Sequence, residues 1–496
     1  MGAPEGNEKP ATVSEQEEIL REALEKPARA TEVVIEGNRR TQEAVILREL
    51  RGLTEAPPTT KLADLFVQAS LASARLHDLG IFEWATVELD DASTAATPAG
   101  APHPTAVRVE LHERPLFHGR IQTSYAAAAR ETTVEATTHF INPLGRAEKI
   151  EVGLEGGLRR LAVAGDGLPY CAHAAYTDPR FLGSNWQYRL EARRAVTDWT
   201  QSSSFRHIST GLSTEFKAPM GVTLAYEIAI QTLTDPTRRA SKAVRTQMGD
   251  ALKSAVSAKW AGAWASHGIA WRTSLRAELA GLAPPMAGLS RYVRKEAAVE
   301  ASTGLKCFIP GARLHVTARG GVLVPWGSSV GRPTPLAERF HLGGVGSLRG
   351  FNARGVGPME PRRQPAEDAA GEGQQAAAPE ATFDSVGGDV MWSLGAALRA
   401  PVPHVRADIP LQWQVFADVG SNVALPAGDD VGTLRALKES WAAARATPRS
   451  SVGAGLVLPF PGAGHLELNM SKVVGSMERD RFKQGWRFQF GLTVSV

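Results

Sequence analysis

The residues whose spacing first suggests chemistry lie in the stretch RFHLGGVGSLRGFNARGVGP, residues 339–358. Six glycines surround a single Leu348-Arg349-Gly350-Phe351. The run contains Gly344-x-Gly346, but arginine occupies position 349, where a dinucleotide-binding motif needs its third glycine. It also lacks the lysine-serine pair of a phosphate-binding loop. We therefore expect this stretch to bind no nucleotide.

Other catalytic patterns are also missing from the sequence. There is no HExxH and no GxSxG, and the 12 histidines do not cluster at metal-ligand spacing. The pair Asp90-Asp91 is more typical of a turn than of general acid-base catalysis. We therefore expect no enzymatic activity, no catalytic residues, no cofactor and no metal site.

Charge and cysteine content narrow the choice of partners. The 55 basic and 52 acidic residues leave a net charge of +3, which is too even to indicate a nucleic-acid partner. Cys171 and Cys307 form neither a disulfide framework nor a CxxC motif, so we expect two ordinary thiols.

Arg349 therefore needs a structural explanation. Glycines permit positive φ angles and close backbone approach, so the stretch can fold back tightly into an interior. A buried guanidinium then requires an acidic partner. In VFADVG, alternation with outward-facing Val415 and Val419 places Asp418 on the opposite face, which makes it the candidate partner. A surface arginine in a flexible hairpin is the alternative.

The elements that would position these residues differ between two parts of the chain. Residues 31–113 predict a small module with the order β-α-α-β-β. Its second helix, within KLADLFVQASLASARLHDLGIF, carries apolar residues at spacings of three and four, namely Leu62, Leu65, Phe66, Ala69, Ala72, Leu76 and Leu79. Residues 1–30 precede the module, and we expect them to be partly helical or disordered.

Residues 115–496 show segments of about ten residues that alternate apolar and polar side chains. The clearest is the last, WRFQFGLTVSV, with Trp486, Phe488 and Phe490 on one face and Gln489 on the other. The pattern predicts a transmembrane β-barrel of about 16 antiparallel strands. A soluble β-sandwich would also alternate, but aromatic residues near the strand ends favour a membrane barrel. Residues 359–383, rich in Ala, Glu, Gln and Pro, predict a disordered insertion.

Several motifs, in order, resemble the BamA-type outer-membrane β-barrel assembly superfamily. LGGVGSLRGF (342–351) is similar to the tip of loop six in that family, which lies inside the barrel, and FADVG (416–420) follows in the family's order. Residues 31–113 resemble a POTRA domain. NPLGRAEKIEV (142–152) and the closing GWRFQFGLTVSV resemble the mitochondrial branch, the barrel subunit of the sorting and assembly machinery (SAM) complex.

The resemblance implies a membrane insertase that folds β-barrel precursors, such as porins, into the mitochondrial outer membrane. Precursor strands would be templated at a lateral gate between the first and last strands. The implied partners are these precursors, peripheral receptor subunits and the lipid bilayer, and the POTRA domain would face the intermembrane space. A chloroplast-envelope or bacterial member of the superfamily is the alternative.

The resemblance also assigns the site residues. Loop six spans residues 339–384, with Leu348, Arg349, Gly350 and Phe351 at its tip and Asp418 as lumen partner. Bacterial members place a glutamate where this chain has Ala397, which leaves a second acidic contact of the arginine unassigned. The gate consists of residues from both terminal strands: Arg120, Ile121, Gln122, Thr123, Ser124 and Tyr125 in the first, and Gln489, Gly491, Val494 and Val496 in the last.

Overall fold

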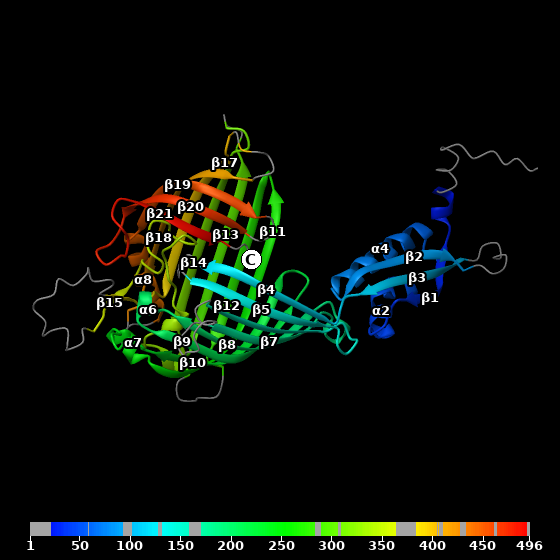
Figure 1. The fold of residues 1–496 in the computed structure, drawn as a ribbon, viewed down its shortest axis with the longest axis horizontal. Coiled ribbons are helices and arrows are strands. Elements are labelled where there is room, and N and C mark those ends of the chain that lie inside the picture. The colour runs from blue at the N-terminus through cyan, green and yellow to red at the C-terminus, as the bar shows by residue number, and fades with distance from the viewer. Residues whose placement is uncertain are drawn as a thin grey trace, which may run out of the picture. The chain divides into compact units, whose positions relative to one another are not determined.

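The structure, a computed structural model, forms two compact units (Figure 1). The first unit contains Met1–Gly119, Thr138–Glu151 and Tyr176–Gln187, and the second contains Arg120–Thr137, Val152–Ala175 and Tyr188–Val496. The described residues are 21–57, 59–92, 102–126, 131–157, 170–282, 289–305, 309–363, 383–403, 405, 410–426, 433–460 and 464–493.

The first unit contains a three-stranded sheet in the order β1-β3-β2. Strand β1 runs parallel to β3, and β2 runs antiparallel to β3. The element order matches the sequence-based expectation, with the first helical segment divided into α2 and α3. The elements are β1 (Ala28–Glu36), α2 (Glu43–Glu49), α3 (Arg51–Thr54), α4 (Leu62–Asp78), β2 (Phe82–Asp91) and β3 (His103–Glu113).

Helix α4 supplies much of the core of this unit. Leu65, Ala69, Ala72 and Leu76 are buried at spacings of four, three and four residues, as the periodicity predicts. Phe66 was expected on the same face but is 48% exposed, because it lies about 100° around the helix from Leu65.

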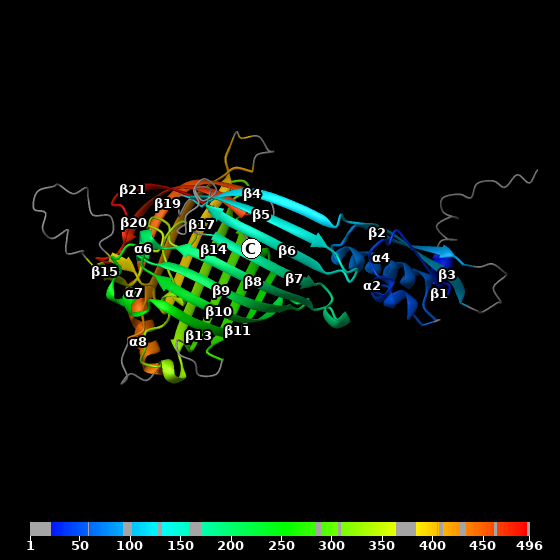
Figure 2. The same ribbon diagram turned by 60° about the horizontal axis from the view of Figure 1, so that its bottom comes forward.

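The second architectural element is a single sheet of 16 strands. Consecutive strands pair antiparallel, and the sheet curls strongly (Figures 1 and 2). Its strands are β4 (Phe117–Ala126), β5 (Glu131–Ile141), β6 (Lys149–Gly157), β7 (Tyr170–Asp178), β8 (Gln187–Asp198), β9 (Arg206–Lys217), β10 (Val222–Thr234), β11 (Gly249–Ser266), β12 (Ile269–Ala280), β13 (Tyr292–Gly304), β14 (Arg313–Pro325), β17 (Val390–Pro401), β18 (Gln412–Val423), β19 (Arg449–Phe460), β20 (Gly464–Gly475) and β21 (Trp486–Thr493).

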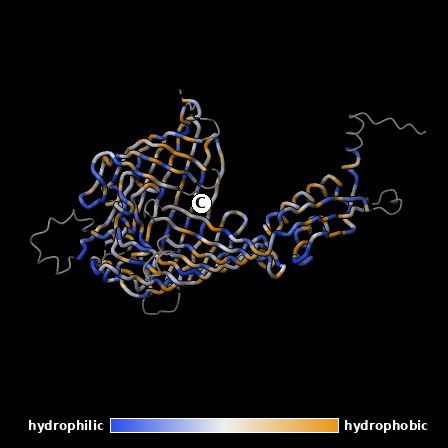
Figure 3. The backbone as a smooth tube through the Cα atoms, viewed as in Figure 1, coloured by the Kyte–Doolittle hydropathy of each residue, from blue (hydrophilic) through white to orange (hydrophobic). Residues whose placement is uncertain are grey.

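Side chains alternate along these strands between an exposed apolar face and an interior polar face. On β10, Leu224, Tyr226 and Ile228 are exposed, whereas Gln231 is buried. Figure 3 shows the same alternation as orange and blue segments along the strands. An exposed apolar face opposite a buried polar face is the arrangement of a membrane β-barrel. The predicted fold class is therefore confirmed.

The two ends of the sheet order are β21 and β4, the last and first of its strands. Both lie on the same side of the curled sheet, β21 in red and β4 in cyan (Figures 1 and 2). Among the described residues, no pairing joins the two strands. The sheet therefore has a seam at this position.

The connections carry short elements. They are η1 (Phe181–Gly183), α6 (Thr200–Ser203), α7 (Lys242–Thr246), η2 (Gly327–Ser329), η3 (Leu336–Glu338), β15 (Met359–Pro361), β16 (Phe383–Ser385) and α8 (Thr433–Ala446). Of the helices in the described part of the chain, none has both the length and the apolar character needed to cross a bilayer.

The sequence predicts a disordered insertion over residues 359–383, but the residues at both ends of this segment lie in strands. Strands β15 and β16 pair with each other, so Met359–Pro361 and Phe383 have a defined structure. Asp384 explains this order, since its carboxylate accepts hydrogen bonds from Arg362 Nε (2.7 Å) and from the Ser241 backbone (2.8 Å). The remaining insertion residues, 364–382, lie outside the described residues.

Candidate functional site

The connection between β14 and β17 covers residues 326–389, a wider span than the 339–384 predicted, and we use the name loop six for all of it. Its tip folds back on itself: Leu342 pairs with Val356, and the Gly344 N–H donates to the Leu348 carbonyl (3.1 Å). Gly343 has a φ of 114°, and a Cβ there would lie 2.5 Å from the Asn352 carbonyl oxygen. Only glycine fits this turn without strain.

The Leu348-Arg349-Gly350-Phe351 tip is buried in the described structure. Leu348 and Phe351 are fully buried in a cluster with Leu342 and Val356. The Phe351 ring also packs edge-to-face on Phe482, with ring centroids 5.7 Å apart. This apolar contact fixes the tip, so the arginine between the two apolar residues has a defined direction.

Arg349 lies against Asp418 of β18. Its Nε and Nη2 atoms each donate to a different carboxylate oxygen at 2.7 Å, and its backbone N–H donates at 3.2 Å. The guanidinium carbon also lies 3.7 Å from the ring centroid of Phe416 on the same strand. A two-point contact of this kind fixes both the position and the plane of the guanidinium.

Glu467 of β20 is a second acidic partner that the sequence analysis did not assign. Its Oε2 atom lies 3.7 Å from Arg349 Nη1, and its Oε1 atom accepts from Arg399 Nη2 at 3.0 Å. Ala397, where the resemblance places the glutamate of bacterial members, lies on β17, so in this chain the second acid comes from a different strand. The alternation in HLELNM, which puts Glu467 on the polar face, was the available signal.

The interior face of β21 also contacts the tip. Gln489 Oε1 accepts from the Gly350 N–H (2.6 Å), and Gln489 Nε2 donates to the Phe351 carbonyl (2.9 Å). A Cβ on Gly491 would overlap the Val345 side chain. The predicted last-strand residues Gln489 and Gly491 therefore form one site with loop six, while Val494 and Val496 lie outside the described residues.

The predicted first-strand residues all fall within β4. Arg120 and Ile121 are exposed, the latter by 78%. The other predicted residues of this strand are Gln122, Thr123, Ser124 and Tyr125. Among the contacts of the described side chains, no hydrogen bond or ion pair connects Arg120 or Ile121 to loop six.

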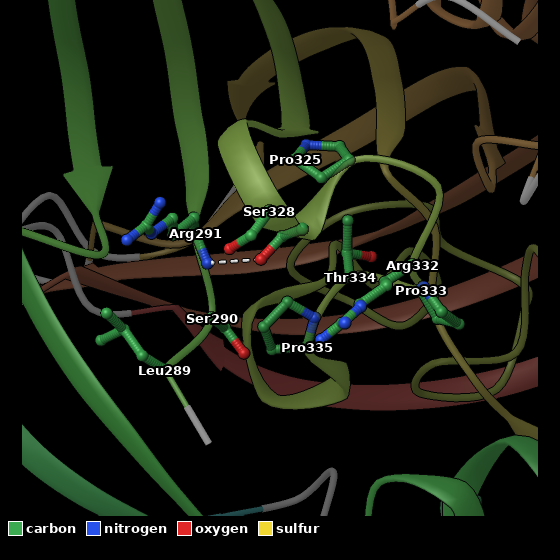
Figure 4. A pocket seen from close by; sticks show the side chains of 10 residues that line it. Leu289, Ser290, Arg291, Pro325, Ser328, Arg332, Pro333, Thr334 and Pro335 are labelled. Atoms are coloured by element: carbon green, nitrogen blue, oxygen red, sulfur yellow. Dashed lines mark hydrogen bonds between the residues drawn. The ribbon is translucent and has the colours of Figure 1, made fainter. Parts of the chain in front are cut away.

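A polar pocket of about 340 Å³ lies near the beginning of loop six. In Figure 4 the Arg332 side chain runs toward Pro335, whereas the Arg291 guanidinium points away and stacks on Trp326 (5.4 Å). None of the sequence-predicted site residues lines this pocket. Its lining residues are Leu289, Ser290, Arg291, Pro325, Ser328, Ser329, Arg332, Pro333, Thr334 and Pro335.

The tip site consists of ionic and hydrogen-bonding contacts between loop six and the sheet. Its charged groups are Arg349, Arg399, Asp418 and Glu467, two of each sign. Across the described residues, no group of three or more His, Cys, Asp or Glu side chains is arranged to hold a metal ion. The site joins loop six to strands β18, β20 and β21.

Comparison with known proteins agrees with this architecture. The 26% identical "Sorting and assembly machinery component 50 homolog" of Bos taurus aligns over 93% of this chain and 89% of its own length. The human homologue has the same identity and coverage, and a SAM50-like protein of Schizosaccharomyces pombe is 23% identical over 96% of this chain and 92% of its own.

A solved structure shares the fold. BamA from Haemophilus ducreyi, in a form lacking POTRA domains 1–3, superposes with a TM-score of 0.68 and 16% identity, covering 93% of this chain and 84% of the other. The family description "Omp85 superfamily domain" matches residues 142–494, which include the whole tip site. The predicted resemblance is thus confirmed, and the chain belongs to the Omp85 superfamily.

Proposed function

We propose that this chain folds β-barrel precursor proteins and inserts them into the mitochondrial outer membrane. Its Omp85 family membership, its SAM50 relatives and its BamA-like fold support this function. The observation that carries the proposal is the contact between loop six and β21: the tip of the loop hydrogen-bonds to this strand, which ends the sheet at the seam. The contacts of the loop-six tip therefore depend on which strand occupies the position of β21.

In this proposal the seam between β4 and β21 is a lateral gate. A strand edge facing lipid leaves N–H and C=O groups without partners, at a cost of several kcal/mol for each group. Such an edge strongly favours any strand that can pair with it. The last strand of a precursor adds to β4 by backbone hydrogen bonding, and the remaining strands follow until the new barrel closes and leaves.

In this proposal the recognised feature of a precursor's last strand is a polar residue followed two positions later by glycine and then by large apolar residues. This chain's own β21 has that pattern at Gln489 and Gly491. Gln489 hydrogen-bonds to Gly350 and Phe351, and the missing side chain of Gly491 leaves room for Val345. A precursor strand in the place of β21 offers loop six the same polar side chain and the same space.

The finer parts of the proposal concern orientation and partners. The POTRA domain faces the intermembrane space and meets precursors before they reach the seam. Peripheral receptor subunits bind the same assembly. Insertion proceeds by exchange of non-covalent contacts, so no bond-making chemistry is assigned to the chain.

Site-specific crosslinking tests the gate. Single cysteines are placed at positions 119–126 of β4, in a background in which Cys171 and Cys307 are replaced by serine. An arrested porin precursor carries one cysteine in its last strand. We expect the disulfide adduct at the β4 position opposite the precursor cysteine, and moving that cysteine by two residues should move the adduct by two positions, since paired strands lie about 4.8 Å apart and successive side chains point to opposite faces.

The matched control is Leu275→Cys on β12, which is 47% exposed on the lipid-facing side and far from the seam in strand order. It should give no adduct. A correctly inserted protein that forms no adduct at any β4 position, or equal adducts at position 275, would contradict the proposed gate.

A further inference from the structure

Loop six carries another buried charge, Glu338, at the end of η3 and 11 positions before Arg349. Its side chain is only 6% exposed. Oε1 accepts hydrogen bonds from Lys253 Nζ (3.0 Å) and Gln231 Nε2 (2.9 Å), and Oε2 accepts from Arg294 Nη1 (3.1 Å). Three strands, β10, β11 and β13, therefore hold one loop carboxylate.

The surrounding network belongs to the barrel wall. Lys253 Nζ also lies 3.1 Å from Glu278 Oε1 and 3.2 Å from Glu227 Oε2. Glu278 in turn accepts from the Tyr292 hydroxyl at 2.9 Å. Among the described ion pairs of this network, Glu338 is the member that loop six contributes.

The neighbouring residue Phe340 strengthens the same attachment. The Arg294 guanidinium lies 5.0 Å from the centre of the Phe340 ring, so one arginine contacts loop six at two residues. Gly321 of β14 makes room for that ring, because a Cβ there would lie 2.6 Å from Phe340 Cε1. Charge, ring stacking and shape together fix this part of the loop.

Glu338 and the tip of loop six are attached to different parts of the sheet. Glu338 is held by β10, β11 and β13, whereas Arg349 is held by β18 and β20, and Gln489 belongs to β21. In the strand order, β14 and β17 separate the two groups. Separation of β21 at the seam therefore breaks contacts at the tip and none at Glu338.

We propose that Glu338 is a positioning residue for precursor insertion. It holds the stem of loop six, the part of the loop that precedes the tip, on strands β10, β11 and β13 while β21 leaves the seam. The inference rests on the proposed function. Without Glu338 this part of the loop keeps its contacts at Phe340, which pairs with Gly388 and accepts from Asn422 Nδ2 (2.8 Å), but it loses its charged contact with β10, β11 and β13. A segment held at fewer points has more conformations to lose when the tip must be presented. With Glu338 bound to the sheet, Val345, Gly350 and Phe351 stay in the positions from which they can contact an incoming strand.

The charge state of Glu338 agrees with this role. Burial raises the pKa of its carboxyl group, but Lys253, the Gln231 hydrogen bond and Arg294 outweigh burial and lower the pKa to about 2. The carboxylate is therefore ionised throughout the physiological pH range, and the attachment does not weaken there.

The test measures where the tip lies. Spin labels are attached at Gly346→Cys, where a side chain meets no neighbouring atom within 4 Å, and at the exposed Leu275→Cys on β12, with Cys171 and Cys307 replaced. Pulsed electron–electron double resonance measures the distribution of distances between the two labels, with the protein in nanodiscs. We expect one narrow distribution in the wild-type background and a broad one in Glu338→Ala.

Glu278→Ala is the matched control, because it also removes a buried carboxylate in contact with Lys253 but touches no loop-six residue among its described partners. It should leave the distribution narrow. Glu338→Asp should restore it in part. If Glu338→Ala does not reach the membrane, Glu338→Gln takes its place, since it keeps the side-chain length and loses the charge.

The functional arm measures insertion of a porin precursor into proteoliposomes. We expect insertion to slow on the order of tenfold in Glu338→Ala and to stay near the wild-type rate in Glu278→Ala. A narrow distribution in Glu338→Ala, or equal broadening in both variants, would overturn the attachment. Broadening with a wild-type insertion rate would overturn its role in insertion. A wild-type chain that inserts no precursor would instead overturn the proposed function, and the distance measurement would still stand.

Discussion

At the scale of single residues, the tip site is an alternating set of charges. Asp418, Arg349, Glu467 and Arg399 follow one another with closest distances of 2.7, 3.7 and 3.0 Å. Removing one member of a buried set leaves its neighbours desolvated and unpaired, which typically costs about 3–5 kcal/mol. The two carboxylates are not equivalent, because Asp418 binds Arg349 at two points and Glu467 at one longer distance.

This difference predicts unequal effects of two charge-removing variants. Asp418→Asn should release the tip and slow precursor insertion more strongly than Glu467→Gln, which leaves the two-point contact intact. Insertion rates in proteoliposomes and the label distance from Gly346 provide the comparison. Equal insertion rates for the two variants would show that the two-point contact with Asp418 holds the tip no better than the single, longer contact with Glu467.

At the scale of elements, strand β21 serves both the sheet and loop six. Its exposed face presents Trp486, Phe488 and Phe490, and its interior face presents Gln489 and Gly491 to the tip. Arg487 also hydrogen-bonds to Asn352 of loop six. Arg487, Gln489 and Gly491, at every second position of the described interior face, therefore all lie against the loop.

The Gly491 contact predicts a steric effect with a specific rescue. Gly491→Ala should push Val345 away from β21 and displace the tip, at a cost of about 1–3 kcal/mol for the overpacked site. Val345→Gly in the same chain should return the tip toward its place. The Gly346–Leu275 label distance reports both changes.

Phe490→Leu provides the control, because its side chain is exposed on the opposite face of β21. It should leave the label distance unchanged. A tip that stays in place in Gly491→Ala would mean that glycine is needed here for another reason.

The same elements show what sequence could and could not predict. Period-two alternation placed Asp418 and Gln489 on the interior face, because side-chain direction in a strand depends only on local geometry. Glu467 lay on that face too, but which of several interior acids reaches Arg349 depends on the shear and curl of the sheet. The sequence also placed Phe66 in the core of the first unit, since a spacing of three or four is satisfied by more than one helical face.

The ends of the predicted insertion at 359–383 differ from the structure for a related reason. Residues 359–363 are rich in proline and charge, which favours disorder when a segment is considered alone. Glu360 accepts a hydrogen bond from the Ala243 backbone (2.9 Å), and Arg362 reaches Asp384, so distant partners order the segment. Glu338 went unnoticed because its partners lie on strands separated from it by up to 107 positions.

At the scale of the whole molecule, the first unit is assembled from three separate stretches of chain. Glu113 connects two parts of it: its carboxylate accepts from the Arg40 backbone (3.0 Å) and from the Thr41 backbone (2.8 Å). Thr41 Oγ1 in turn accepts from Asn142 Nδ2 at 2.9 Å. One carboxylate therefore orders the segment that bridges two stretches of the unit.

This arrangement predicts a loss of order in acid. Burial raises the pKa of Glu113, but hydrogen bonds from Thr41 and Arg40 outweigh it and hold the pKa below the ordinary 4.5. The stabilisation is therefore fully present above pH 4.5 and is lost as the pH falls through the lowered pKa. Amide hydrogen exchange of Arg40 and Thr41, corrected for intrinsic rates, should accelerate over that range.

Glu113→Gln is the matched variant, because glutamine keeps the side-chain shape and does not titrate. It should show faster exchange at neutral pH and no further pH-dependent loss. Protection that falls equally with pH in both proteins would assign the titration to another group.

The seat of loop six on β21 has a kinetic consequence in the proposed mechanism. The chain's own last strand is tethered next to β4, so it competes with every incoming strand at an effective concentration in the millimolar range. A precursor strand must pair with β4 and contact the tip of loop six more favourably than β21 does. Random hydrophobic segments fail that threshold, whereas a strand with the full signal passes it. When a finished barrel departs, return of the resident strand is fast because it is intramolecular, which makes each cycle of insertion self-terminating.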